Sequence, residues 1–192
     1  LIGFIDDDCI PAHDWIAAAR RAVADSPGSA VWLGTLVRDE QRLAGPPEFP
    51  ERRWSLRGPG DPWHVGPTGG NSLFRRSVFE RVGAFEAELG QGSVYPGAED
   101  GDMIFRVLTA GLEVTFTSTI RVFHLPWRHE LENEDNGYNY GLGVGAMLAK
   151  FVRQGHTVPM ARIFARRFLA KSLAVPYYLL LGRRHDRPCR RQ

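Results

Sequence analysis

The sequence predicts an α/β protein, and three observations lead to that prediction. Short apolar runs with the character of strands alternate with segments of helical periodicity. Glycine and proline separate most of these segments. The composition, with 43% hydrophobic and 24% charged residues, is that of a globular protein, and 192 residues can bury a substantial core in one domain.

The first element that we expect is a strand over residues 1–5. This apolar run ends at three aspartates, and Pro11 stops any continuation. A buried strand of a parallel sheet needs neighbours on both sides. We therefore expect this sequence to lack an N-terminal half-domain that would supply those neighbours.

A helix is predicted over residues 14–24, because apolar residues recur there at helical spacing. The expected apolar stripe consists of Trp15, Ile16, Ala19 and Val23. The turn-forming residues 26–28 end this helix, and residues 30–37 have the pattern of a strand. This succession of strand, helix and strand is typical of α/β folds.

A long irregular segment follows. Residues 39–68 are rich in proline and glycine, which predicts a loop, and loops of this length are usually lids, binding loops or disordered. Three aromatic side chains indicate partial order within it: Trp54, Trp63 and His64. A short apolar segment, residues 72–74, follows Gly69-Gly70-Asn71.

Helices and strands return after residue 76. Ser77 is expected to cap a helix at 78–82, which Gly83 would end. A second helix begins near Glu99 and runs to about residue 110, with Gly111 at its end. Strands at 113–117 and 120–123 complete the pattern, and the last of them ends in His124.

The most informative motif is Asp6-Asp7-Asp8, directly after the first strand. Side chains alternate along an extended backbone, so Asp6 and Asp8 should point to one side and Asp7 to the other. Two carboxylates that converge at a strand end suit a hard divalent cation, which commonly neutralises phosphate charge. The alternative is an acidic turn exposed to solvent.

A second acidic motif, Glu99-Asp100, lies in the first turn of a predicted helix. Acids there are also favoured by the helix dipole alone. Asp102 and Arg106, four residues apart, are expected to form a structural pair on the helix surface. The imidazole of His124 would suit Mn²⁺, although a histidine at a strand end often has only a structural role.

In their order and spacing over residues 1 to about 150, these motifs resemble those of the family 2 glycosyltransferases, inverting enzymes of the GT-A fold. The resemblance rests on Asp6-Asp7-Asp8, Gly69-Gly70-Asn71, Arg75-Arg76, Val82-Gly83-Ala84-Phe85, Glu99-Asp100 and Val122-Phe123-His124. It implies transfer of a sugar from a nucleotide-sugar donor to an acceptor hydroxyl, on a glycan or a lipid-linked molecule. A divalent cation, Mn²⁺ or Mg²⁺, would assist.

The resemblance also implies roles for individual residues. The metal ligands would be Asp6, Asp8 and His124, with Asp6 or Asp7 reaching the ribose. Asp100 would be the general base, and Glu99 would bind or orient the acceptor. The segment Gly69-Gly70-Asn71 would contact the donor, since glycine lets a backbone approach closely.

Two departures from the family pattern limit these expectations. The first part of the nucleotide-binding half has no counterpart here. The Gln-x-x-Arg-Trp motif of processive members is also missing from the sequence, because Pro126-Trp127-Arg128 is not equivalent to it. We therefore expect single transfers and not processive polymerisation. The resemblance itself implies a role in the synthesis of cell-envelope or polysaccharide glycans.

Charge divides the chain into an acidic body and a basic tail. Residues 1–140 hold 13 Lys and Arg against 21 Asp and Glu, whereas residues 141–192 hold 11 Lys and Arg and a single acid, Asp186. We expect residues 1–125 to form the catalytic part and residues 126–192 a mainly helical extension. The basic amphipathic segment 160–184 either contacts an anionic membrane surface or packs as an ordinary helix.

Two other classes of function are compatible with these residues. A remnant of the GT-A fold could act as a binding module without catalysis. The same carboxylates could also serve a metal-dependent phosphoryl-transfer enzyme or nuclease. No nucleic-acid-binding motif accompanies the basic tail, so we expect no nucleic-acid partner. Cys9 and Cys189 have neither metal nor disulfide spacing, so we expect a reducing cytoplasm, at the inner face of the membrane if the tail binds there.

Overall fold

The computed structural model describes residues 1–38, 51–61, 69–125 and 130–165, and for residues 38 and 130–136 the backbone alone. Two compact units are distinguished, Leu1–Lys150 and Phe151–Gln192. The predicted division after residue 125 concerns function and stays a prediction.

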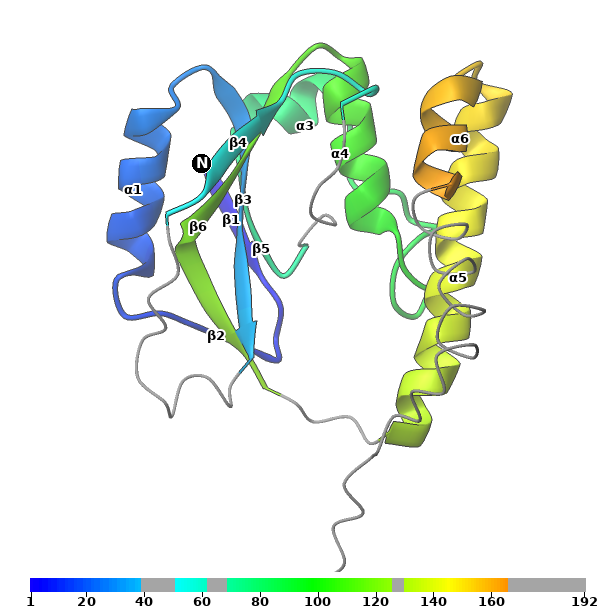
Figure 1. The fold of residues 1–192 in the computed structure, drawn as a ribbon, viewed down its shortest axis with the longest axis horizontal. Helices are drawn as coiled ribbons and strands as arrows, with labels where there is room; N and C mark the ends of the chain where they lie inside the picture. Colours follow the sequence, from blue (N-terminus) through cyan, green and yellow to red (C-terminus); the bar gives the residue numbers. More distant parts are fainter. Residues whose placement is uncertain (39–50, 62–68, 126–129, 166–192) are drawn as a thin grey trace, which may run out of the picture. The chain divides into compact units, whose positions relative to one another are not determined.

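The first unit is built on a six-stranded mixed sheet with the order β1-β5-β3-β6-β2, in which β4 also pairs with β6 (Figure 1). The strands are β1 (Ile2–Ile5), β2 (Cys9–Pro11), β3 (Ser29–Arg38), β4 (Arg53–Leu56), β5 (Asn71–Phe74) and β6 (Glu113–His124). β3 and β6 are parallel, and the other described pairs are antiparallel. The predicted α/β class, with a mixed sheet and flanking helices, is confirmed.

Helices cover both faces of the sheet. α1 (Trp15–Asp25) lies on one face, and α3 (Arg76–Val82) and α4 (Glu99–Thr109) lie on the other (Figure 1). The alternation along β3 explains this arrangement, since successive side chains of a strand point to opposite faces. Val31 and Leu33 pack in the cluster with α4, and Trp32 packs in the cluster with α1.

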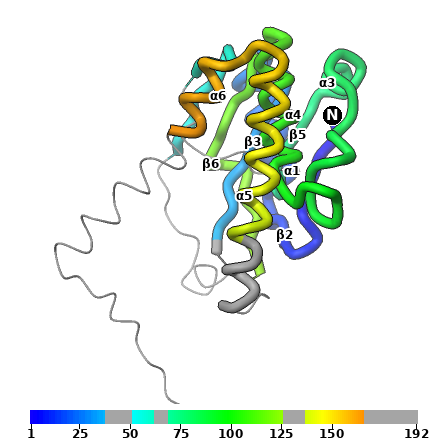
Figure 2. The backbone as a smooth tube through the Cα atoms, turned by 90° about the vertical axis from the view of Figure 1, so that its right-hand side faces the viewer, coloured from blue at the N-terminus to red at the C-terminus, as the bar shows by residue number. Residues whose placement is uncertain are grey.

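Two more helices follow β6: α5 (Glu130–Arg153) and α6 (Thr157–Phe164). α5 belongs to the first unit as far as Lys150, whose ammonium group contacts Asp102 of α4 (Figure 1 and Figure 2). The run of glycines at residues 137–145 lies within α5. α6 belongs to the second unit, where Met160 is buried and Val158 and Phe164 are exposed.

The expectation that the first strand lies in a parallel arrangement is contradicted at its described pairing. Among the described strands, β1 pairs with β5 alone, and the pairing is antiparallel. Ile2 remains 38% exposed. On the face of β1 that is covered, Phe4 packs on Phe74 and Phe85, with ring centroids 5.6 and 5.3 Å away.

Two strands were predicted where β6 forms one. Residues 117–120 do not end it, because the register with β3 shifts from Leu33↔Phe116 to Thr35↔Arg121 and the extra residues are absorbed as a bulge. Within the segment predicted to be a loop, β4 pairs with β6, and Trp54 stacks on Phe116 at 4.1 Å. The predicted order at Trp54 is thus confirmed, and Trp63 and His64 lie outside the described residues.

Two local predictions about helices were also wrong. In the predicted apolar stripe of α1, Ile16 is wrong, because it is 65% exposed. Trp15 and Ala19 are buried as predicted and Val23 packs against the same cluster, which also holds Ala18 and Ala22. Ser77 lies inside α3, whose N-cap is Arg75 and has no side-chain cap bond. Gly83 does end α3, as predicted, with φ of 82°.

Candidate functional site

The three aspartates form a tight turn between β1 and β2. The Cys9 N–H donates to the Asp6 carbonyl oxygen at 3.0 Å, which closes the turn. β2 then pairs with the end of β6, and Cys9 faces His124 in the register. This pairing brings the His124 imidazole to Asp8, with 3.3 Å between Nε2 and Oδ2.

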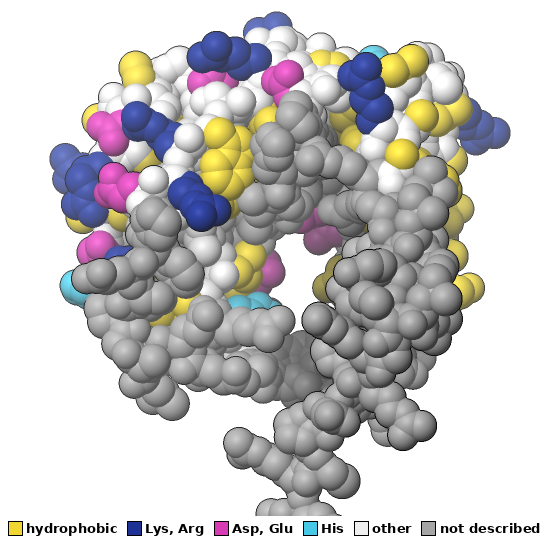
Figure 3. Space-filling model, in the orientation of Figure 1, with side chains coloured by type: hydrophobic (Ala, Val, Ile, Leu, Met, Phe, Trp, Pro, Cys, Tyr) yellow, Lys and Arg dark blue, Asp and Glu magenta, His cyan; other side chains and the backbone are white. Residues whose placement is uncertain are grey.

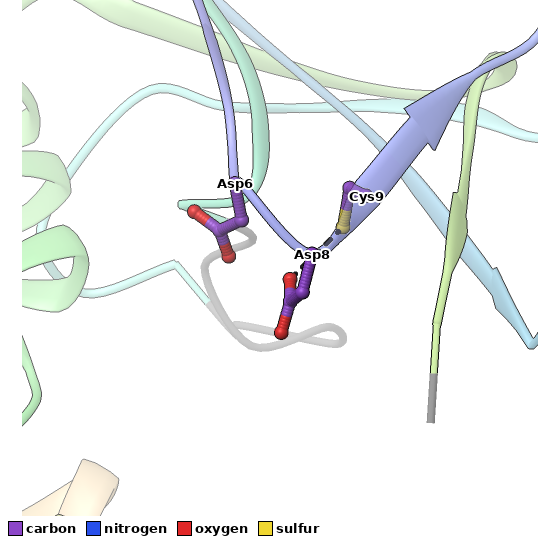
Figure 4. A group of neighbouring side chains, drawn as sticks. All are labelled: Asp6, Asp8 and Cys9. Carbon is purple, nitrogen blue, oxygen red and sulfur yellow. Dashed lines mark hydrogen bonds between the residues drawn. The ribbon is translucent and has the colours of Figure 1, made fainter. Parts of the chain in front are cut away.

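Asp6 and Asp8 converge as predicted, but for a different reason. Ligand atoms of Asp6, Asp8 and Cys9 all lie within 4.8 Å of one another. Figure 4 shows both carboxylates on the same side of the turn. The prediction assumed alternation along an extended strand, whereas the turn itself brings the two side chains together.

Cys9 is the member of this group that sequence reasoning missed. Its thiol lies 3.6 Å from Asp8 Oδ1. Burial, followed by the charges of Asp8 and Asp6, raises the pKa of the Cys9 thiol to about 12. The thiolate is the form that ligates metals, so at neutral pH the oxygens of Asp6 and Asp8 are the better ligands.

The pKa of Asp6 is raised by its surroundings. Burial raises its pKa most, then Asp8, Glu99 and Asp7 raise it further, while His124 has a smaller opposite effect. Glu99 therefore belongs to the same electrostatic environment, although 93 positions separate it from Asp6 in the sequence. A bound cation would relieve this repulsion.

The glycine pair lies between the two acidic motifs. A Cβ atom on Gly70 would come within 2.8 Å of Asp6 Cγ, and one on Gly69 within 3.2 Å of Asp100 Cβ. The Asp6 N–H also points to the Gly70 carbonyl oxygen, at 3.4 Å. A side chain on Gly69 or Gly70 would push the neighbouring carboxylate away from the backbone. Glycine therefore allows Asp6 and Asp100 to approach the backbone of these two residues.

Asp100 is held at the start of α4 by backbone donors. The Gly69 N–H donates to its Oδ2 at 3.3 Å and the Gly101 N–H to its Oδ1 at 2.6 Å. Beside it lies a small pocket lined by Leu33, Gly69, Ser72, Phe74, Phe85, Asp100 and Ile104. In Figure 3, acidic and histidine side chains are visible near the centre of the face shown.

Of the other two predicted residues, Asn71 is buried in the core and Asp7 lies in the turn between Asp6 and Asp8. Asn71 is fully buried: its amide donates to the carbonyl oxygens of Thr35 and Ile120, and its Oδ1 accepts from Trp15. These contacts support a structural role more than contact with a donor. Asp7 is exposed in the turn.

The predicted pair of Asp102 and Arg106 is confirmed, with 2.7 Å between Oδ2 and Nε. Asp102 is fully buried, and its Oδ1 also accepts a hydrogen bond from Lys150 of α5 at 2.7 Å. Sequence reasoning missed Lys150. The one available signal was that the chain has only two lysines, Lys150 and Lys171.

Comparisons of this chain with models of protein families, with curated proteins and with solved structures found no match. Among the residues that the structure describes, no helix has both the length and the apolar character needed to cross a membrane.

Proposed function

We propose that this chain is an inverting glycosyltransferase of the GT-A fold, which transfers a sugar from a nucleoside-diphosphate donor to an acceptor hydroxyl. The observation that carries the proposal is the approach of two acidic motifs to one glycine pair. Asp6 lies against Gly70, and Asp100 lies against Gly69. The order of the motifs along the sequence supports the same function.

The residues at the turn fit a divalent cation. Two carboxylates within 4.8 Å of each other offer hard oxygen ligands, and His124 adds an imidazole beside Asp8. Asp6 and Asp8 would hold Mn²⁺ or Mg²⁺, with His124 as a further ligand. When bound, the ion would neutralise negative charge on the diphosphate leaving group.

The second motif would act on the acceptor. Asp100 is the general base that removes the proton of the attacking hydroxyl, and its two backbone donors fix the orientation of the carboxylate. Glu99 orients the acceptor. The backbone of Gly69 and Gly70 borders the donor sugar, while Asn71 holds β5 in place from the core.

The test is to incubate the protein, with Mn²⁺, with a panel of nucleotide sugars and candidate glycan acceptors. The proposal predicts release of nucleoside diphosphate that depends on acceptor, together with a new glycosidic bond of inverted configuration. Donor binding without turnover would instead identify a non-catalytic binding module. Cleavage of phosphate esters without glycosidic products would indicate phosphoryl transfer.

Attachment to the cytoplasmic face of a membrane through residues 160–184 stays a prediction from the sequence. Most of this segment lies outside the described residues. Flotation with anionic and neutral liposomes at low and high salt would test it. Binding that is equal for both lipids and insensitive to salt would contradict the proposed electrostatic contact.

A further inference from the structure

Tyr140 and Gly143 of α5 contact the residues that immediately precede Glu99 and Asp100. A Cβ atom on Gly143 would lie 2.8 Å from the Pro96 carbonyl oxygen, and closer still to that of Gly97. Backbone atoms cannot move aside as the end of a flexible side chain can. Glycine at position 143 is therefore what allows α5 to reach this loop.

A second contact from the same helix meets the same loop. The Tyr140 ring lies against Gly97, where a Cβ atom would come within 2.6 Å of the ring atom Cδ1. Gly97 also has φ of 101°, a conformation that side-chain-bearing residues rarely adopt. Tyr140 and Gly143, one helical turn apart, both contact Gly97.

The next residue, Ala98, is the N-cap of α4 and is strained. Its φ of 68° is left-handed, and among the described residues it is the one non-glycine residue with positive φ. This conformation is unfavourable for a residue with a Cβ atom. Such strain persists where the surroundings fix it, and it is concentrated at functional sites.

α5 is also fixed at a second point on α4. Lys150 follows Gly143 by seven residues, about two helical turns, so both lie on one face of α5. Lys150 Nζ lies 2.7 Å from Asp102 Oδ1 and 2.7 Å from Glu86 Oε2. The helix thus contacts the loop before α4 and also the first turn of α4.

We propose that Tyr140 and Gly143 are positioning residues, which fix the start of α4 so that the Asp100 carboxylate meets Gly69. This inference rests on the proposed function of Asp100 as the base. Asp6, Asp8 and His124 come from the β1–β2 turn and β6, so loss of the α5 contact leaves their positions unchanged. The contact therefore affects the rate of transfer and not the binding of the donor.

Two glycines of α5 provide a matched pair for the test. Gly143→Ala places a methyl group against the backbone of residues 96–97, whereas a Cβ on exposed Gly145 meets nothing within 4 Å. Gly143→Ala should lower kcat about 10- to 100-fold, with KM for the donor and the affinity for Mn²⁺ unchanged. Gly145→Ala should keep wild-type kcat and raise Tm by about 2–4 °C, because alanine is the better helix former.

Hydrogen exchange of the Gly69 and Gly101 amides, which donate to Asp100, gives a readout that needs no activity. Both amides should exchange faster in Gly143→Ala and at the wild-type rate in Gly145→Ala. Unchanged exchange together with unchanged kcat in folded Gly143→Ala would overturn the inference. If the wild-type protein transfers no sugar, the proposed function fails, and amide exchange still decides the positioning role.

If Gly143→Ala does not fold, Tyr140→Ala takes its place, since it removes the ring without creating a clash. It should show the same loss of kcat and the same faster exchange. Tyr140→Phe keeps the ring against Gly97 and should restore both to near the wild-type values. Wild-type behaviour of Tyr140→Ala would contradict the proposal.

Discussion

Asp6 and Asp102 are acids of the same compact unit, but their surroundings differ. Asp102 is fully buried and lies 2.7 Å from each of two cations, Arg106 and Lys150. Glu86 shares Lys150, and this hydrogen bond lowers the pKa of its carboxyl. At Asp6, burial and the neighbouring acids outweigh the single histidine, so its pKa is raised.

Asp102 and Asp6 therefore represent two kinds of acid. Asp102 stabilises the fold, whereas Asp6 is held beside other acids despite their repulsion. A buried carboxylate with two cations secures α4 and α5 to each other. At the turn, burial and the neighbouring carboxylates raise the pKa of Asp6, which makes its ionised form unfavourable for folding, and a cost of this kind is common at functional sites. Substitutions at Asp102 and Lys150 alter the first kind of acid site, and substitution of Asp6 alters the second.

The largest effect is expected for Asp102→Ala. It removes the shared carboxylate and leaves the partly buried ends of Arg106 and Lys150 without one of their acceptors, which should lower the free energy of unfolding by about 3 kcal/mol. Urea unfolding would measure this change. Glu80→Gln, in an exposed pair with Arg76, is the control and should change it by less than about 0.5 kcal/mol. Similar stabilities of the two variants would show that the buried network contributes little.

A smaller effect is expected from pH, through Glu86 and Lys150. The folded pKa of Glu86 is below its ordinary value of 4.5, so its contribution is present above about that pH and is lost as the pH falls through the folded pKa. Burial lowers the pKa of Lys150, but hydrogen bonds to Asp102 and Glu86 raise it more, to above 10.5. The lysine contribution is therefore present below that pH and is lost only as the pH rises through the folded pKa.

The wild-type protein should lose stability as the pH falls from about 5 to 3. In Lys150→Met this loss in the free energy of unfolding should be smaller by about 1 kcal/mol, since the pair is partly exposed. Thermal unfolding of both proteins across this range would measure the difference. Parallel pH profiles would contradict the assigned partnership of Glu86 and Lys150.

The smallest change in stability is expected for Asp6→Asn. A raised folded pKa means that the stability linked to Asp6 is present at low pH and is lost as the pH rises through that pKa. Asp6 is exposed, so solvent screens much of this repulsion. Replacing the carboxylate should thus raise Tm at pH 7, without divalent cations, by about 1 °C. Mn²⁺ should raise Tm of the wild-type protein by mass action but not that of Asp6→Asn. An equal response of both proteins to Mn²⁺ would remove Asp6 from the metal site.

Features that depend on local sequence were predictable. The strand before Asp6, the helix that begins at Glu99 and the strand that ends in His124 each follow from apolar patterning and nearby glycine or proline. The pair of Asp102 and Arg106 also follows from helical spacing alone. Most residues of the candidate site were therefore named before their arrangement was known.

Features that depend on distant pairing were not predictable. The bulge that keeps β6 continuous requires the register with β3, and β2 is a strand only because β6 is beside it. The glycines of α5 favour a break when judged by propensity, yet Gly143 is required for contact with Gly97. The buried hydrogen bonds of Asn71 likewise join residues far apart in the sequence.

Asp100 and the carboxylates at the turn have different proposed roles: Asp100 removes a proton, and the carboxylates hold the cation. The decisive measurement compares Asp100→Asn with the wild-type protein in donor binding and in transfer to the acceptor. The substitution is nearly isosteric but cannot accept a proton, so transfer should fall by about 10² or more while donor affinity in the presence of Mn²⁺ is unchanged. Wild-type transfer by Asp100→Asn would leave Asp100 as a residue of the helix start alone and would contradict the proposed mechanism.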